Sequence, residues 1–97
     1  MNDLMRRTRE ASRIKEGYPE GTRILLEHMN DPLAPVPAGT RGTVQFVDDA
    51  GQIHMSWDNG RSLALIRGED SFRKLTDEEV AQEAKAKAQE TGMNMGM

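Results

Sequence analysis

The side chains best suited to acid–base or metal chemistry are two histidines, His28 and His54. His54 stands two residues before Ser56, but spacing places no carboxylate where it would orient the imidazole for nucleophilic catalysis. Asp48 and Asp49 could join the histidines around a metal only if the fold brought them together. A turn in which each carboxylate bonds its own backbone is the simpler interpretation. With no cysteine in the chain, we expect no enzymatic activity, no metal and no cofactor.

Two other groups of side chains could bind a partner. Arginines spread along the chain, with Lys74 and the N-terminal arginines, could contact nucleic-acid phosphates. Three of the four prolines fall within residues 30–39, a long loop that could grip another protein or could wrap the edge of the sheet. Together with one histidine expected on the solvent face, the candidate binding residues are Arg23, Arg41, His54, Arg61, Arg67, Arg73, Pro35 and Pro37.

Charge is unevenly distributed along the 97 residues, whose net charge is −3. Residues 1–16 carry a net charge of +2, residues 17–75 carry −2 and residues 76–97 carry −3. Nonspecific nucleic-acid binding needs a basic footprint that such a domain lacks. We therefore expect another protein as partner and keep nucleic acid as the alternative. The oligomeric state does not follow from the sequence.

The elements that must position these residues are short strands around a central stretch, 42–65. Val44 and Phe46 alternate on one strand, and pairing 44 with 55 and 46 with 53 places all the large apolar side chains on one face. The tip of the turn is then Asp49-Ala50, with Gly51 at positive φ. Gly42 falls opposite Trp57, where room for an indole is needed.

A three-residue loop, 58–60, would follow the second of these strands, with Gly60 left-handed. It pairs 55 with 63 and 53 with 65, so that Leu63 and Leu65 join the apolar face. We expect five strands, at 22–29, 42–48, 52–57, 61–66 and 72–75. The fold class is mainly β, a small SH3-like five-stranded antiparallel barrel with flanking N-terminal and C-terminal helices. The predicted core is Ile24, Leu26, Val44, Phe46, Ile53, Met55, Trp57, Leu63, Leu65 and Phe72.

Four segments follow from this pattern. Residues 1–16 are a helical or frayed arm with a thin apolar stripe of Leu4, Ala11 and Ile14. Residues 17–75 form the barrel, and residues 76–90 form a helix that starts at a capping box of Thr76 and Glu79. Residues 91–97 are a disordered tail. No apolar run reaches the roughly 20 residues of a membrane span. The sequence also shows no signal peptide. We therefore expect a cytoplasmic protein with no membrane contact.

The middle of the chain contains an ordered series of motifs: Tyr18-Pro19-x-Gly21-Thr22-Arg23, Met29-x-Asp31, Pro37-x-Gly39-Thr40-Arg41-Gly42-Thr43-Val44, Val47-Asp48-Asp49-x-Gly51-x-Ile53, Trp57-Asp58-Asn59-Gly60 and Gly68-x-Asp70. In this order they resemble a family of bacterial and phage proteins, the domain of unknown function numbered forty-three fourteen. The resemblance covers about residues 17–75 and implies a small β-barrel domain, often encoded by phages and mobile elements, with no assigned activity.

Two classes of function remain open. The first is a protein-interaction module of a phage or mobile element, and one form of it is an acidic inhibitor that mimics nucleic acid against a host defence enzyme. The second is an accessory protein that binds nucleic acid through its arginines. The acidic balance and the lack of a catalytic motif favour the interaction module.

Overall fold

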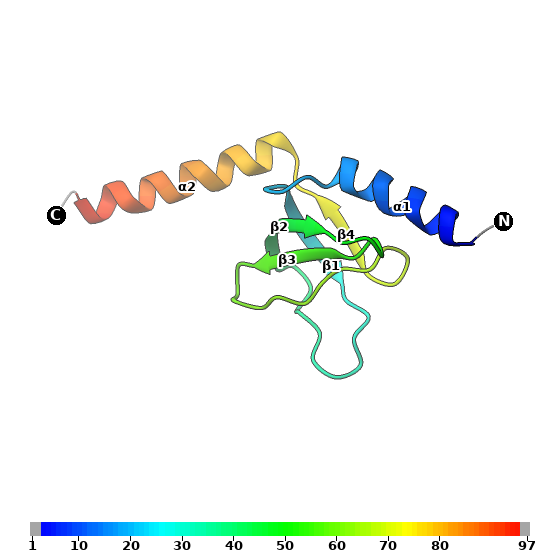
Figure 1. Ribbon diagram of the computed structural model, residues 1–97. Helices are drawn as coiled ribbons and strands as arrows, with labels where there is room; N and C mark the ends of the chain where they lie inside the picture. Colours follow the sequence, from blue (N-terminus) through cyan, green and yellow to red (C-terminus); the bar gives the residue numbers. More distant parts are fainter. Residues whose placement is uncertain (1–2, 96–97) are drawn as a thin grey trace.

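A four-stranded sheet lies at the centre of the molecule, and a helix extends from it on either side (Figure 1). The computed structural model describes the backbone of residues 3–95 and the side chains of residue 6 and residues 8–87. In chain order the elements are α1 (Asp3–Gly17), β1 (Arg23–His28), β2 (Arg41–Val47), β3 (Ile53–Trp57), β4 (Ser71–Lys74) and α2 (Asp77–Met95).

The sheet is antiparallel and open, with the strand order β3-β2-β1-β4. The predicted closed five-stranded barrel is therefore wrong. Residues 61–66 form no strand and contribute a single bridge, from Leu65 to Ile53. The carbonyl of Leu63 accepts the indole N–H of Trp57 at 2.9 Å. The predicted pairing of 55 with 63 is not seen, whereas the predicted pairing of 53 with 65 is confirmed by two backbone hydrogen bonds, at 2.9 and 2.8 Å. The sheet gains no strand beyond β3.

The pairing of β2 with β3 agrees with the prediction at the start of β2 and differs from it after Val44. Val44 faces Met55, as expected, and Gly42 faces Trp57. A bulge then follows Val44, so that Phe46 faces His54 rather than residue 53. An extra residue on one strand sends the following side chains to the opposite face. The prediction that Phe46 belongs to the core is thus wrong: its side chain is 53% exposed.

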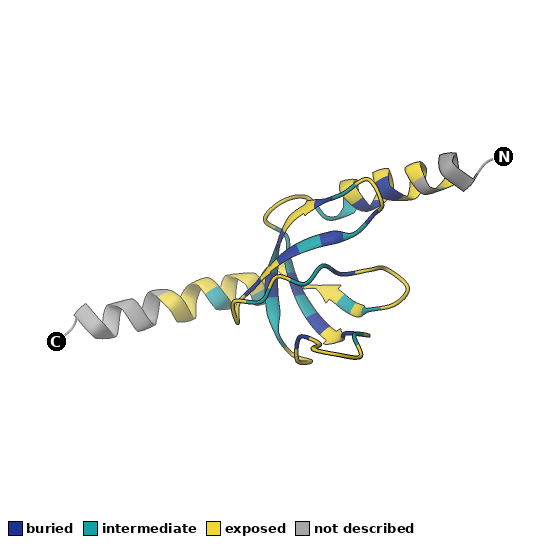
Figure 2. Cartoon of the chain, turned by 60° about the horizontal axis from the view of Figure 1, so that its bottom comes forward, coloured by how far each residue is buried: buried dark blue, intermediate teal, exposed yellow. Residues whose placement is uncertain are grey.

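The core lies between the sheet, α1 and the loops on the concave side, and its buried positions follow the strands in Figure 2. Seven predicted core residues are buried, while Leu63 and Phe72 pack against them and are partly exposed. Val47 takes the place that the parity argument gave to Phe46. The predicted and buried residues are Ile24, Leu26, Val44, Ile53, Met55, Trp57 and Leu65, and the core cluster also includes Ile14, Met29, Val36 and Val47.

The N-terminal segment is helical and packs on the sheet. Ala11 and Ile14, two members of the predicted stripe, are buried, whereas Leu4 lies outside the described side chains. Both lie over Gly51, which has a φ of 85° as the turn requires. A Cβ at residue 51 would stand 3.2 Å from the Ile14 Cδ1 atom. The close packing of α1 on this turn therefore depends on the missing side chain.

The C-terminal helix begins as predicted. The Thr76 hydroxyl accepts the backbone N–H of Glu79 at 3.1 Å, and the Glu79 carboxylate accepts that of Thr76 at 2.8 Å. The helix continues past the predicted end at residue 90 to Met95. Gly92 within it costs about 1 kcal/mol relative to alanine, which weakens a helix without forbidding it. The rest of the predicted tail, 96–97, lies outside the described residues. Neither helix, over the residues described, combines the length and apolarity needed to cross a membrane.

Candidate functional site

A cluster of charged side chains joins the sheet to the start of α2. Arg23 donates two hydrogen bonds to Glu83, at 3.0 and 2.7 Å, and two to Asp58, at 2.9 and 2.6 Å. It also donates to the Thr43 hydroxyl at 3.0 Å. Arg41 donates to the same Glu83 carboxylate at 3.0 Å. These five residues, called the Arg23 cluster below, place each guanidinium against a carboxylate.

The hydrogen bonds of the cluster keep its members charged. Those from Arg23, and next those from Arg41, lower the pKa of Glu83 to about 2. Arg23 also lowers the pKa of Asp58, and the bonds to Asp58 and Glu83 raise the pKa of Arg23. Two cations face two anions, so the cluster presents little net charge to a ligand. Arg23 and Arg41, which were predicted to contact a partner, both form ion pairs within the chain.

The remaining predicted arginines differ in their surroundings. Arg73 pairs with Glu79 at 2.8 Å, and Arg61 donates to the backbone carbonyl of Ala34. Arg67 is exposed, and within the described part of the chain no ion pair holds it. It lines two shallow hollows of about 410 and 230 Å³, one of them shared with Arg13 of α1. The structure thus does not gather the predicted arginines into one basic surface.

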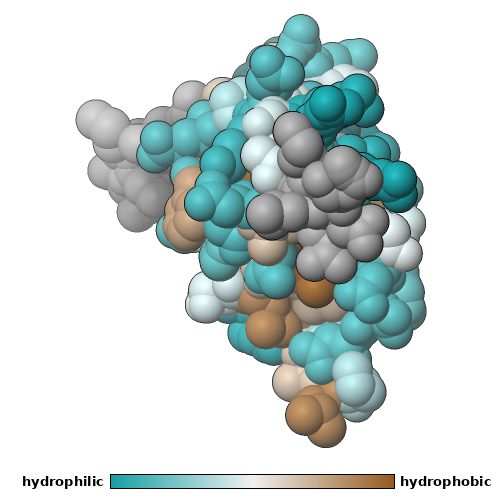
Figure 3. Space-filling model, turned by 45° about the vertical axis from the view of Figure 1, so that its right-hand side comes forward, coloured by the Kyte–Doolittle hydropathy of each residue, from teal (hydrophilic) through white to brown (hydrophobic). Residues whose placement is uncertain are grey.

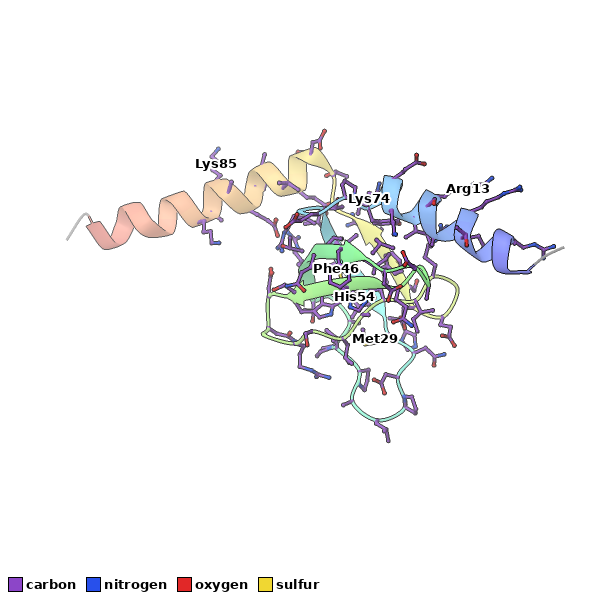
Figure 4. All side chains as sticks on the ribbon, viewed as in Figure 1. Arg13, Met29, Phe46, His54, Lys74 and Lys85 are labelled. Atoms are coloured by element: carbon purple, nitrogen blue, oxygen red, sulfur yellow. The ribbon has the colours of Figure 1, made fainter. Side chains whose placement is uncertain are left out.

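His54 has an orienting carboxylate that sequence spacing did not reveal. Its Nε2 atom lies 2.9 Å from Asp48 Oδ2, and its ring stacks on Phe46 with centroids 4.3 Å apart and an interplanar angle of 9°. Figure 4 shows Phe46 and His54 side by side on the strands. The bond to His54, with the N–H groups of Gln52 and Ala50, lowers the pKa of Asp48. Ser56, which faces Thr43 instead, provides no hydroxyl at the imidazole.

The His54–Asp48 pair is therefore an oriented imidazole without a nucleophile bonded to it. His28, the other histidine, lies on β1 opposite Ser71 of β4. Among the residues that the structure describes, no three His, Asp or Glu side chains converge as metal ligands would. The pair and Phe46 form a partly exposed ring surface on the sheet, which can stack on a ligand or form hydrogen bonds with it.

The loop between β1 and β2, residues 29–40, is braced at its base. Met29 and Val36 are buried in the core, and the Val36 N–H points to the Met29 sulfur at 3.3 Å. The backbone N–H of Asn30 donates to the Asp70 carboxylate at 2.8 Å. These contacts tie the loop to the core and to the turn before β4, so that its ends cannot move independently of the sheet.

Its outer half is also braced, by polar contacts. Asp31 Oδ1 accepts the backbone N–H groups of Leu33 and Ala34, at 2.9 and 3.3 Å. Arg61, from the loop after β3, holds the Ala34 carbonyl. Asp31 and Arg61 are thus structural: they shape a loop in which three prolines already restrict φ.

The tip that these contacts support is apolar. Residues 32–35 read Pro-Leu-Ala-Pro, and all four are exposed, Leu33 to 91% of its surface. The loop projects away from the sheet at the bottom of Figure 1, and a hydrophobic group stands at the lower end of the surface in Figure 3. Of the predicted prolines, Pro35 belongs to this tip and Pro37 is exposed beside it.

Two functional features escaped sequence reasoning. Leu33 is not among the predicted binding residues. The run of residues 32–35, which has a proline at each end and no polar side chain, could have indicated it. Glu83 is likewise absent from the candidate residues. Its position one turn after Glu79, on the same side of α2, placed both carboxylates where strand arginines could reach them.

Comparison with known families accounts for most of the chain. No curated protein matches it. The family model described as Domain of unknown function (DUF4314) matches residues 7–75, which span α1 from its second turn, the braced loop and all four strands, and stop before α2. The match extends the resemblance seen in the motifs of residues 17–75 into the N-terminal helix. The chain belongs to the DUF4314 family.

Proposed function

We propose that this protein is a non-enzymatic binding module that inserts the tip of its 29–40 loop into an apolar hollow on another protein. The observation that carries the proposal is the exposed run of residues 32–35 on a braced loop. Consecutive exposed apolar residues are disfavoured in a soluble fold unless they serve a function. Removing Leu33 from water in a complex would recover the free energy that its exposure now costs.

The bracing of the loop supports the same proposal. Ordering a flexible loop on binding costs roughly 0.5–1.5 kcal/mol for each side chain immobilised, and a preformed loop avoids most of this. Asp31, Val36 and Arg61 all hold the loop before any partner arrives. A tip without charged side chains favours a hydrophobic pocket, with the surrounding polar backbone meeting the rim of the partner.

The alternatives have less support. Arg23, Arg41 and Arg73 each pair with a carboxylate of this chain, so they have little charge to offer a nucleic acid. An inhibitor that mimics nucleic acid needs free carboxylates, yet Glu79 and Glu83 are paired with arginines. A phage or mobile-element setting rests on the family resemblance alone.

The proposal can be tested by photo-crosslinking in native host cells. A benzoylphenylalanine at position 33 should crosslink to one protein, whereas the same probe at the exposed Lys85 of α2 should not. The crosslinked protein is then purified and its affinity for the wild type and for Leu33→Asp is measured by calorimetry. We expect a loss of at least tenfold with Leu33→Asp, because a charge would be buried in an apolar pocket.

Ile66→Asp is the matched control, since Ile66 is exposed but lies outside the loop. It should leave the affinity within about twofold. Both variants should unfold at the wild-type urea midpoint. Equal binding by the wild type and Leu33→Asp, or no crosslink at position 33, would refute the proposal.

A further inference from the structure

A second surface, away from the loop tip, carries arginines of a different kind. Successive residues of a helix are rotated by about 100°, so Arg6, Arg9 and Arg13 share one face of α1. Ala11 and Ile14, buried against the sheet, lie toward the opposite side of the helix. The three arginines are exposed. Figure 4 places Arg13 on α1, across the molecule from Lys85 of α2.

A fourth arginine reaches this surface from a distant part of the chain. Arg67 and Gly68, in the turn before β4, line the hollow of about 410 Å³ that they share with Glu10, Arg13 and Ile14. Gly68 has a φ of 93°, and no atom lies within 4 Å of where its Cβ would stand. The turn therefore leaves the approach to Arg13 and Arg67 open to a bulky ligand.

Within the described part of the chain, these four arginines lack the carboxylate contacts made by Arg23, Arg41 and Arg73. Over the residues described, ion pairs hold Arg23, Arg41 and Arg73 but none holds Arg6, Arg9, Arg13 or Arg67. Residues 6–17 contain two acidic residues, Glu10 and Glu16, against four arginines and Lys15, an excess of three positive charges. Each free guanidinium keeps five N–H donors, in a fork that fits two phosphate oxygens.

The chemistry of the surface favours a polyanion over an apolar partner. Protein interfaces usually have an apolar centre. Among the side chains that the structure describes, the large exposed hydrophobic ones are Leu33, Phe46, Ile66 and Val80, and none of these four is in α1. Ile66 precedes Arg67 in the chain but is not among the residues that line the hollow. Contacts to a nucleic-acid backbone need no such centre, because arginine side chains on phosphates are sufficient to position the protein.

We propose that Arg6, Arg9, Arg13 and Arg67 form a phosphate-contact face that binds a nucleic-acid backbone without reading its sequence. From residue 6 to residue 13 the helix rises by about 10 Å, a length over which duplex DNA carries about six phosphate charges. The face lies apart from the braced loop, so the protein can hold a nucleic acid and a protein partner together. The proposed nucleic-acid binding by this face does not depend on the proposed function of the 29–40 loop.

The test is fluorescence anisotropy of a labelled 20-base-pair duplex and of a labelled single strand, titrated with the full chain at 25 to 200 mM NaCl. Four phosphate contacts predict that log K falls with log salt at a slope of about −3 to −4. The double variant Arg9→Gln, Arg13→Gln should reduce the slope by about 2 and weaken binding at least tenfold at 50 mM NaCl. Glutamine keeps nearly the helix propensity of arginine, and circular dichroism checks that α1 remains folded.

Arg73→Gln is the matched control, because it removes the same charge from an arginine already paired with Glu79. Its slope should stay at the wild-type value, while Glu10→Gln should tighten binding. Absence of binding to either nucleic acid at 25 mM NaCl overturns the proposal. So does binding that the double variant and Arg73→Gln weaken equally. Equal affinity for a poly-glutamate peptide, with the same arginine dependence, would assign the face to an acidic protein instead.

Discussion

Gly42 is a position at which the core leaves no room for a side chain. A Cβ there would stand 2.6 Å from Trp57 Cε3 and 3.1 Å from the methyl carbon of Met55. Both neighbours are fully buried, so neither can move without disturbing the packing. We expect Gly42→Ala to lower the free energy of unfolding by roughly 1–3 kcal/mol. Urea unfolding followed by the fluorescence of the single tryptophan measures it.

A matched substitution separates this clash from the general effect of replacing glycine. No atom lies within 4 Å of a Cβ built at Gly17, the last residue of α1. Gly17→Ala should change the free energy of unfolding by no more than about 0.5 kcal/mol. If the two variants were equally stable, the indole would have to be freer to shift than its burial indicates.

At the scale of elements, α2 is attached by charge more than by apolar burial. Val80, the largest apolar residue of its first turns, is 38% exposed, and none of the α2 residues whose side chains are described, 77–87, belongs to the core cluster. The helix is held through Glu83 in the Arg23 cluster and through Glu79 on Arg73. Its attachment should therefore respond to pH in a way that the sheet's apolar core does not.

The direction of that response follows from the lowered pKa values. Glu79 and Glu83 each have a pKa of about 2 in the folded protein, against 4.5 for a free glutamate. Their stabilisation is complete above pH 4.5 and is lost as the pH falls from 4.5 toward 2, where both carboxylates become protonated. We expect the midpoint of thermal unfolding to fall over this window, measured by circular dichroism at pH 6, 4 and 3.

Glu83→Gln should be less stable than the wild type at pH 6 and should show a shallower loss on acidification, because one of the titrating groups is gone. Glu20→Gln serves as the control, since Glu20 is exposed and makes no ion pair among the residues described. An acid response of Glu83→Gln as steep as that of the wild type would show that the cluster contributes no pH-dependent stability.

The molecule as a whole is elongated, 65 × 30 × 17 Å, because both helices extend outward from the sheet and only α1 packs part of its length on it (Figure 1). The two helices are not equivalent. α1 contributes Ala11 and Ile14 to buried positions and lies mostly within the family match, whereas α2 lies outside that match. The unit that folds should therefore consist of α1 and the sheet.

Deleting each helix tests this division. A chain of residues 1–75 should unfold cooperatively with only a small loss of stability. A chain of residues 18–97 loses the buried Ile14 side chain and should be destabilised by about 2–5 kcal/mol. Urea unfolding of the two truncated chains gives the comparison, and the opposite order would mean that α2 is the more important support.

The sequence by itself determined the features that depend on neighbours along the chain. Alternation of apolar residues identified most of the core and the pairing of Val44 with Met55, because side chains on a strand alternate between faces. The capping box at Thr76 was readable for a similar reason, since both of its hydrogen bonds join residues three apart. The φ of Gly51 likewise follows from a tight local turn.

Only the tertiary structure decided the features that depend on distant groups. The bulge that turns Phe46 outward and the indole hydrogen bond to the Leu63 carbonyl each depend on how separate segments meet in the fold. The pairing of Arg23 with Glu83, sixty positions along the chain, separates structural arginines from free ones such as Arg13. Charge and residue type are the same in both groups, so the sequence cannot distinguish them. The distance between opposite charges, which folding alone establishes, determines which arginines remain available to a ligand.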